Sequence, residues 1–321
     1  MANMNAAVVT SFEQPPHYQQ FEVPQPTAGE QLVDVLAVGL HPRVRSGAAG
    51  AHYTSAGTLP MIPGIDGVGR RPDGNRIYFV ADDDVLGTMA DKALVDERRS
   101  IELPDDVDAA TVAATMNPAM SAWVALRLRV PIKPGQRVLV LGATGNAGTM
   151  AIQVAKLLGA GRVVGAGRDL ERLNALTTVG ADQIVQLTDD TDATAKALAD
   201  AAANVDIVID YVWGKPAAQA IMALLTARSD PSHQLNWIQI GAIAGPTIEL
   251  PSVALRSANL RLQGNGQGAV STQAYLSQLP SLVDQINAGT IALRANPTAL
   301  ADVEQIWATT DGPGKRTVLI P

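Results

Sequence analysis

Three glycines stand between two apolar runs near the middle of the chain, in the segment "LGATGNAGTM". The run before them, "RVLVL", has the composition of a buried strand, and the run after them, "AIQVAKLLG", has the spacing of a helix. Glycine permits a sharp turn and lets the backbone come close to a ligand. The amino end of the helix then directs N–H groups and its positive dipole end at an anion. The segment therefore indicates a phosphate-binding turn.

The glycine spacing favours a dinucleotide over an isolated phosphate. The frame G-x-G-x-x-G, placed between a strand and a helix with a second strand behind them, is typical of dinucleotide binding. Here the frame has alanine at its first position, and its residues are Ala143, Thr144, Gly145, Asn146, Ala147 and Gly148. We expect these six residues to bind the cofactor. The alternative is an ordinary tight turn in an unrelated α/β protein.

The end of the second strand indicates which dinucleotide is bound. Sites for NAD usually carry Asp or Glu there, which accepts a hydrogen bond from the ribose 2′-OH. In "VVGAGRDLERL" this position is Gly167, and Arg168 follows it. A guanidinium is a natural partner for a 2′-phosphate, so Gly167 and Arg168 predict NADPH. Two questions stay open. Asp169 either reaches the ribose, which favours NADH, or caps the next helix. Arg168 is either the partner of the 2′-phosphate or a solvated surface residue.

The turn belongs to a long alternating pattern. Strand-like and helix-like segments follow one another from 137 to 243, which predicts an α/β fold with a doubly wound parallel sheet and helices on both faces. The residues before Pro118 are rich in proline and glycine, with strand candidates at 32–40 and 75–80, and they suggest an irregular β-rich domain. The tail holds "NLRLQG", one helix over 271–289 and a last strand, "RTVLIP". We expect residues 1–117 and 256–321 to form one discontinuous domain, and residues 118–255 to form the cofactor domain.

Composition narrows the range of partners. The net charge is −7 and the estimated pI is about 5.1, which disfavours nucleic acid and anionic membranes, since these require clustered Lys and Arg. The chain has no cysteine, which excludes disulfides and thiolate metal ligands. Its start does not resemble a signal peptide, and no apolar run approaches the roughly 20 residues that span a bilayer. We expect a soluble cytoplasmic protein with a small-molecule substrate.

Segments along nearly the whole chain resemble the medium-chain dehydrogenase/reductase superfamily. They are "LPMIPGIDGVGR", "GTMADKALVDERRSIELPDDVDAATVAATMNPAMSAWVAL", the glycine-rich turn with its flanks, "DIVIDYVWG", "IQIGAIAG" and "GKRTVLIP". The resemblance implies a GroES-like substrate domain, built from both ends of the chain, and a Rossmann domain. It also implies a cleft for nicotinamide and substrate, and a homodimer.

The chain departs from the zinc-dependent members of this superfamily. The position of their first zinc-binding cysteine falls in "AVGLHP", and the family's "GHE" motif is Gly64-Ile65-Asp66, without histidine. The four-cysteine lobe is replaced by "RRPDGNRIYFV". We therefore expect no metal site, and we read Asp82–Asp84 as a solvated loop. The segment "VRSG" after "GLHP" resembles the zinc-free quinone oxidoreductase branch, which has enoyl reductases as close relatives.

This branch implies hydride transfer from NADPH to a quinone or an α,β-unsaturated carbonyl compound. Without zinc, the developing oxyanion needs hydrogen-bond donors. The candidates are His41, Tyr53 and Asn117, each with a plain alternative: a loop histidine, a packing or exposed tyrosine, and a helix or turn cap before Pro118.

Further cofactor contacts are implied by the resemblance. Ser121 stands where relatives have a threonine near the carboxamide. The segment of Gly241, Ala242 and Ile243 is expected to run under the nicotinamide. Two other functions stay open: a redox-silent NADPH-binding sensor or structural protein, and a zinc alcohol dehydrogenase, which the missing cysteines argue against.

Overall fold

The computed structural model describes residues 2–52, 55, 57–81, 85–266 and 268–321. The chain divides into two compact units, one made of 1–117 with 272–321 and the other of 118–271. The second boundary differs from the expected one, because it falls after residue 271 and not after 255. The cause is β13 (Leu260–Gly264), which pairs in parallel with β12 (Leu235–Gln239) and so belongs to the second unit.

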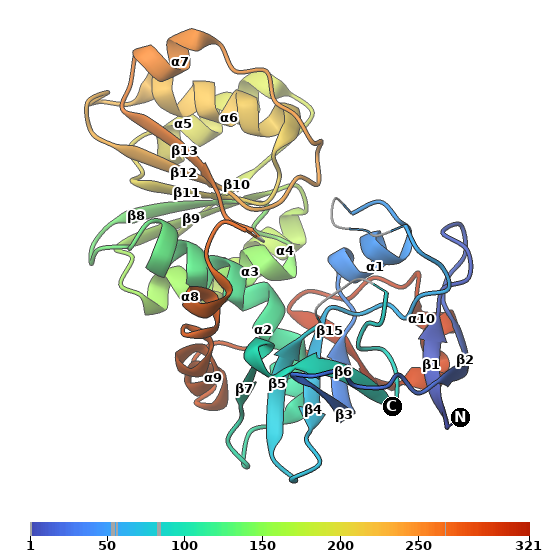
Figure 1. Ribbon diagram of the computed structural model, residues 1–321. Coiled ribbons are helices and arrows are strands. Elements are labelled where there is room, and N and C mark those ends of the chain that lie inside the picture. The colour runs from blue at the N-terminus through green and yellow to red at the C-terminus, as the bar shows by residue number, and fades with distance from the viewer. Residues whose placement is uncertain (1, 53–54, 56, 82–84, 267) are drawn as a thin grey trace. The chain divides into compact units, whose positions relative to one another are not determined.

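The second unit is a doubly wound α/β layer structure (Figure 1). Its six strands are all parallel and lie in the order β10-β9-β8-β11-β12-β13. The other four strands are β8 (Arg137–Leu141), β9 (Arg162–Gly167), β10 (Gln183–Gln186) and β11 (Ile207–Asp210). The helices are α3 (Asn146–Leu157), α4 (Leu170–Ala175), α5 (Thr191–Ala202), α6 (Gly214–Ala227) and α7 (Ser252–Arg256). Figure 1 shows α5 and α6 on one face of the sheet and α3 on the other, which confirms the predicted alternation.

The strand order creates a switch point between β8 and β11. The chain first builds outward from β8 through β9 to β10, and then returns to the other side of β8 with β11. At such a point the connections leave the carboxyl edge of the sheet in opposite directions, which opens the crevice in which open α/β sheets bind ligands. The strands carry apolar side chains on both faces, and Leu139, Val164, Val208 and Trp237 are fully buried.

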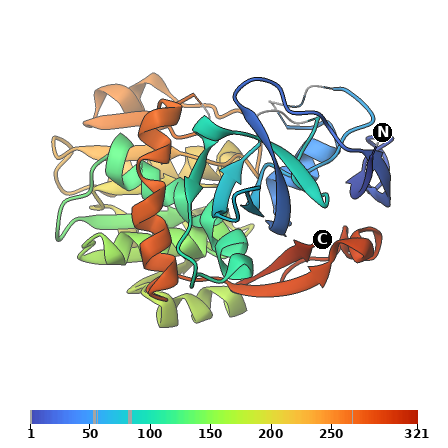
Figure 2. The ribbon, with the colours of Figure 1, turned by 60° about the horizontal axis from the view of Figure 1, so that its bottom comes forward.

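The first unit is mostly antiparallel. One sheet runs β14-β15-β3-β4-β5-β7, with β6 paired to β3, and β1 and β2 form a separate pair. Its strands are β1 (Asn3–Val8), β2 (His17–Glu22), β3 (Glu30–Gly39), β4 (Asp66–Arg70), β5 (Arg76–Val80), β6 (Lys92–Asp96), β7 (Ser100–Glu102), β14 (Arg294–Ala299) and β15 (Lys315–Ile320). Figure 2 shows β14 and β15, in red, side by side as the parallel pair of this sheet.

Helices of the first unit connect these strands. They are α1 (Pro42–Ala48), α8 (Thr272–Leu276), α9 (Leu279–Asn287) and α10 (Val303–Ile306), and α2 (Ala109–Val124) crosses from the first unit into the second. The described residues also include four short helical turns: Glu97–Arg99, Ala125–Arg129, Leu176–Val179 and Leu300–Asp302. Within the described residues, no helix combines the length and the apolar character that crossing a bilayer requires.

The single helix expected over 271–289 is in fact two helices, α8 and α9. Pro280 lies in the first turn of α9. Proline has no N–H to donate to the preceding turn and fits the first turn of a helix, where no such hydrogen bond is made, so Pro280 favours the start of a new helix here. The start of α2 has a side-chain cap. The carboxylate of Asp108 accepts hydrogen bonds from the N–H and the hydroxyl of Thr111, both at 2.7 Å.

Candidate active site

The glycine-rich turn follows β8 directly and opens α3. Gly142 has a φ of +81°, a conformation that favours glycine. A Cβ on Gly148 would lie 2.3 Å from the Gly142 carbonyl oxygen, so the close packing of α3 on the end of β8 depends on this glycine.

Gly145 serves a different purpose. It is the N-cap of α3, and as a glycine it has no side chain with which to cap the helix. A Cβ on Gly145 would meet only the Gly142 oxygen, at 3.7 Å, beyond its chain neighbours. The space in front of the helix is thus open, and its amino end directs N–H groups into that space. This cradle fits a pyrophosphate, as the motif predicts.

Tyr211 follows β11 and lies against this turn. A Cβ on Gly142 would be 3.2 Å from the Cβ of Tyr211, and a Cβ on Gly241 would be 2.7 Å from the Tyr211 carbonyl oxygen. The Tyr211 hydroxyl lies 2.9 Å from the Ser121 hydroxyl. Two predicted residues that are far apart in sequence, Ser121 and Gly241, therefore both lie against Tyr211, which also packs on Gly142 at the switch point. Sequence reasoning gave Tyr211 no part in the site.

A buried carboxylate shapes the connection between β11 and α6. Asp210 accepts hydrogen bonds from the N–H groups of Val212 at 2.8 Å and Trp213 at 2.9 Å, and from the indole of Trp237 at 3.0 Å. Burial raises the pKa of Asp210. Trp213 has a φ of +52°, which is strained for a residue with a side chain. The three donated hydrogen bonds hold this turn at the carboxyl edge of the sheet.

The end of β9 shows why this strand lacks a carboxylate. A Cβ on Gly167 would lie 2.7 Å from Cγ2 of Thr144, so the glycine-rich turn itself occupies the space that a longer side chain needs. Arg168 follows and is exposed, with a guanidinium nitrogen 2.8 Å from the Asp189 carboxylate. Asp169 caps α4, because its carboxylate accepts from the Arg172 N–H at 3.0 Å. Of the two roles open to Asp169, the structure shows the helix cap.

The segment after β12 also lies at this edge. The Gly241 N–H donates to the Asp210 carbonyl oxygen at 3.1 Å. Ala242 and Ile243 are exposed, and Ile243 has 87% of its surface accessible, the largest value among the exposed large hydrophobic residues. Apolar surface of this kind at the carboxyl edge of a parallel sheet is suited to covering by a ligand.

In the first unit, His41 belongs to a buried polar cluster with Asp66 and Tyr78. His41 precedes α1, Asp66 begins β4, and Tyr78 lies on β5 diagonally opposite Asp66, which pairs with Val80. The imidazole Nε2 is 3.1 Å from one Asp66 oxygen, and the Tyr78 hydroxyl donates to the other at 2.8 Å. Their exposed fractions are 3%, 2% and 0%. We call this group the His41–Asp66–Tyr78 cluster.

The cluster determines the form of the His41 ring. A carboxylate only accepts, so the hydrogen lies on Nε2, and in the neutral ring Nδ1 carries the lone pair. Burial lowers the pKa of His41, with Arg316 and Arg43 acting in the same direction and Asp66 opposing them. Burial also raises the pKa of Tyr78. At neutral pH the ring is uncharged and can offer only an acceptor at Nδ1.

The other predicted donors have different positions. Asn117 is half-buried inside α2, so its interpretation as a cap before Pro118 is wrong: the helix continues through both residues. Tyr53 lies outside the described residues, as do Asp82–Asp84. Among the residues that the structure does describe, no three or more His, Asp or Glu side chains form a group that could hold a metal ion.

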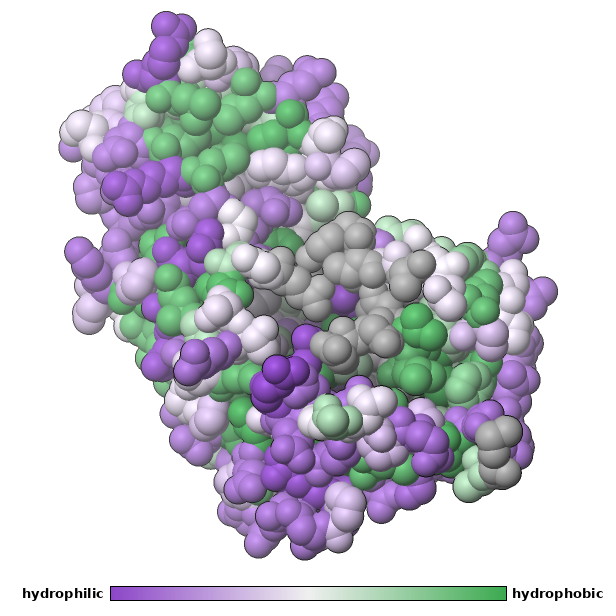
Figure 3. Space-filling view, in the orientation of Figure 1, coloured by the Kyte–Doolittle hydropathy of each residue, from purple (hydrophilic) through white to green (hydrophobic). Residues whose placement is uncertain are grey.

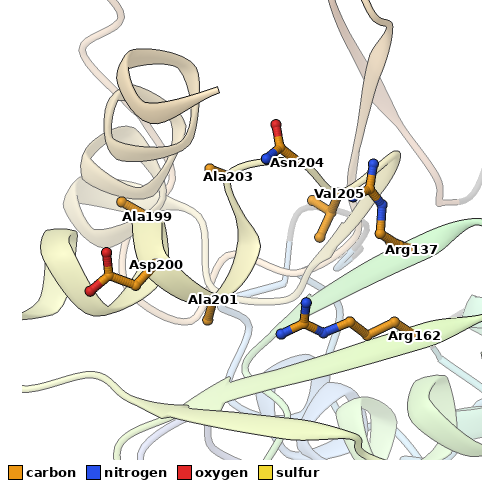
Figure 4. Close-up of a pocket in the computed structure, with 8 residues that line it drawn as sticks. All are labelled: Arg137, Arg162, Ala199, Asp200, Ala201, Ala203, Asn204 and Val205. Carbon is orange, nitrogen blue, oxygen red and sulfur yellow. The ribbon is translucent and has the colours of Figure 1, made fainter. Parts of the chain in front are cut away.

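One cavity of the second unit lies at the amino edge of the sheet, opposite the carboxyl edge that carries the glycine-rich turn. Figure 4 shows its lining, with Arg137 and Arg162 directed toward Val205 and Ala201. These arginines are the first residues of β8 and β9, whereas the glycine-rich turn follows the opposite end of β8. Arg137 lies 3.7 Å from the Asp206 carboxylate, and Arg162 donates to the Gln183 side chain. Both guanidinium groups already have protein partners.

Comparisons with known proteins agree with this architecture. The family model described as zinc-binding dehydrogenase matches residues 147–230. A probable NADPH-dependent quinone reductase of Emericella nidulans is 29% identical, over 99% of this chain and 100% of that protein. A quinone oxidoreductase of Pongo abelii is 34% identical over 43% of this chain and 44% of its own length. The quinone oxidoreductase of Thermus thermophilus, solved also in complex with NADPH, has a TM-score of 0.79 at 24% identity, over 99% of this chain and 100% of that one.

Proposed function

Since the chain belongs to the medium-chain dehydrogenase/reductase superfamily, in its quinone oxidoreductase-like branch, we propose that it reduces a quinone or an α,β-unsaturated carbonyl compound with NADPH. The observation that carries the proposal is the glycine-capped amino end of α3, with room beside Gly145, at the switch point of the sheet. The full-length similarity to a probable NADPH-dependent quinone reductase supports it.

The residues of the second unit suit NADPH. The turn from Ala143 to Gly148 offers backbone N–H groups and room for the pyrophosphate. Arg168 is the guanidinium for the 2′-phosphate, and Ser121 with the segment 241–243 holds the nicotinamide half. When bound, NADPH supplies a hydride to an electron-poor carbon. The protein supplies the positioning and the electrostatic environment.

The substrate oxygen needs hydrogen-bond donors. We propose Asn117 as the principal donor, because its amide donates at any pH. His41 donates from Nδ1 only when it is protonated, since its Nε2–H is directed at Asp66 and burial lowers its pKa. Tyr53 remains a candidate on sequence grounds. Quinones and activated enones demand little from such donors, because their reduced forms spread the negative charge.

We propose that the reaction is independent of zinc. The donor set supports this: the chain has no cysteine, and His41 and Asp66 hydrogen bond to each other. We expect chelators to leave the rate unchanged. A loss of activity on chelation that zinc restores would contradict the proposal.

We also propose a homodimer. The outermost strand of the parallel sheet, β13, pairs only with β12 among the described strands. Its other edge is therefore available for pairing with a second copy of the chain. Leu262 on β13, together with Val253 and Leu255 on α7, is exposed, and Figure 3 shows green apolar surface over this part of the molecule. The molar mass from light scattering distinguishes a dimer from a monomer.

The central test is the oxidation of NADPH, followed at 340 nm with 1,4-naphthoquinone as acceptor. We expect turnover by the unaltered protein and none by Gly145→Asp. This substitution has room for its Cβ and provides α3 with a capping carboxylate, so the fold is kept while the phosphate is repelled.

Binding of NADPH without turnover across quinones and enones would support the redox-silent alternative. A second variant examines the 2′-phosphate contact. Arg168→Ala should raise the Michaelis constant for NADPH far more than that for NADH, and equal effects on both would refute this role of Arg168.

A further inference from the structure

Arg168 already has an anionic partner. The first residues after β10 lie beside the end of β9, because Gln186 pairs with Gly167 and the Leu187 N–H donates to the Gly167 carbonyl oxygen at 2.7 Å. This pairing brings Asp189 to Arg168, and their side chains are 2.8 Å apart. The carboxyl edge of the sheet therefore regains, from the third strand, the carboxylate that the second strand lacks.

The neighbouring carboxylates are engaged in helix caps. Asp169 caps α4, and Asp190 caps α5 by accepting from the N–H groups of Asp192 and Ala193 at 3.1 and 3.0 Å. Asp189 instead faces the guanidinium. Gln186 holds the segment in place, since its amide donates to the Arg168 carbonyl oxygen at 3.2 Å.

We propose that Asp189 determines how strongly the protein prefers NADPH to NADH, an inference that rests on the proposed function. The 2′-phosphate of NADPH must displace the Asp189 carboxylate from Arg168 and is repelled by it. The 2′-OH of NADH carries no charge and can donate a hydrogen bond to that carboxylate. The Arg168–Asp189 pair thus offers one partner to each cofactor, and Asp189 keeps the preference for NADPH small.

The exposure of the pair suits this exchange. The Arg168 side chain is 76% exposed and that of Asp189 is 95% exposed. Water screens ion pairs of this kind, so they contribute little to stability and open readily. The repulsion between Asp189 and a phosphate should weaken as salt is added, because the Debye length falls to about 3 Å at 1 M.

The test measures binding in the absence of substrate. Dissociation constants for NADPH and NADH are obtained from the fluorescence of the bound nicotinamide, for the unaltered protein and for Asp189→Asn. We expect the variant to lower the Kd of NADPH about fivefold at low ionic strength, since one like charge is removed beside the phosphate. We expect it to raise the Kd of NADH about twofold, since a charged acceptor becomes a neutral one.

A matched control is available on α5. Lys196 and Asp200 form another exposed ion pair, with side chains 76% and 65% exposed, and Asp200→Asn should change neither constant. In the Arg168→Ala background, Asp189→Asn should improve NADPH binding less than it does alone, because no guanidinium remains to be released.

The outcomes separate the two proposals. An unchanged ratio of the two dissociation constants in Asp189→Asn, or a shift toward NADH, would overturn the role of Asp189. Binding that changes as expected in a protein that reduces no quinone would support the role of Asp189 and contradict only the proposed reaction. If neither NADPH nor NADH binds, both the role of Asp189 and the proposed reaction are overturned.

Discussion

Asp66 in the first unit and Asp189 in the second are both carboxylates that face a nitrogen donor, yet their surroundings differ. Asp66 is 2% exposed and accepts from two buried neutral side chains, His41 and Tyr78. Asp189 is 95% exposed and faces one charged guanidinium, that of Arg168. The distances are similar, at 3.1 and 2.8 Å from nitrogen to oxygen. The geometry of the contact alone therefore does not distinguish the two.

The difference lies in what replaces a lost partner. When Asp189 is removed, water solvates Arg168 at once, so little free energy changes. When Asp66 is removed, the Nε2–H of His41 and the hydroxyl of Tyr78 remain buried without an acceptor, and their desolvation is no longer compensated. The exposed carboxylate is thus suited to exchange with a ligand, and the buried one to holding a ring in one orientation.

The largest effect should come from Asp66→Ala. We expect it to lower the free energy of unfolding by about 3 kcal/mol, because two buried donors lose their acceptor. Urea denaturation measures this change. Tyr78→Phe removes one donor and leaves one Asp66 oxygen unpaired, so it should cost about half as much. A cost below 1 kcal/mol for Asp66→Ala would mean that water reaches the cluster and would remove the contrast with Asp189.

A smaller effect should appear with pH. The pKa of His41 is lowered in the folded protein, so the unfolded chain binds a proton more readily. The ordinary pKa of a histidine side chain is about 6.5. The stabilising effect of a neutral His41 is complete above that pH and is lost as the pH falls below it.

The contribution of His41 has an upper limit of about 1.4 kcal/mol per pH unit. Urea denaturation between pH 5 and 7.5 should therefore show a shallower pH dependence for His41→Asn than for the unaltered protein. Equal slopes for the two proteins would indicate that His41 is not desolvated as the structure shows.

The smallest effect should come from Asp189→Ala. Because both partners are exposed, we expect the free energy of unfolding to change by less than about 0.5 kcal/mol. The same urea denaturation as for Asp66→Ala gives the comparison directly. A loss above 1 kcal/mol would show that the Arg168–Asp189 pair supports the fold, and it would then be unsuited to exchange with a phosphate.

Patterns within short segments predicted much of the cofactor half. The strands and helices from Arg137 to Gln239 are confirmed close to their expected bounds, because each carries its own periodicity and turn residues. One of the two roles given to Asp169 is also local, since the cap involves a residue three positions along. The glycines of the turn between β8 and α3 could likewise be recognised from a few neighbouring residues.

Contacts between distant residues were beyond such patterns. Nothing near Asp189 in the sequence points to Arg168, which is 21 positions away, and nothing in "GID" points to His41. The segment "NLRLQG" was assigned to the wrong domain, because its composition says that it is a strand but not which sheet it joins. Alternation in "NRIYFV" could have placed Tyr78 inside the first unit, but its diagonal relation to Asp66 requires the register of β4 and β5.

By itself the sequence determined the βαβ frame, the turn that suits a dinucleotide, and the absence of thiolate ligands, since these follow from backbone geometry and residue chemistry over a few positions. Only the tertiary structure decided which carboxylate caps a helix, which faces Arg168 and which is sealed beside His41. That choice depends on burial and on strand pairing, and both arise from side chains that meet only after the chain has folded.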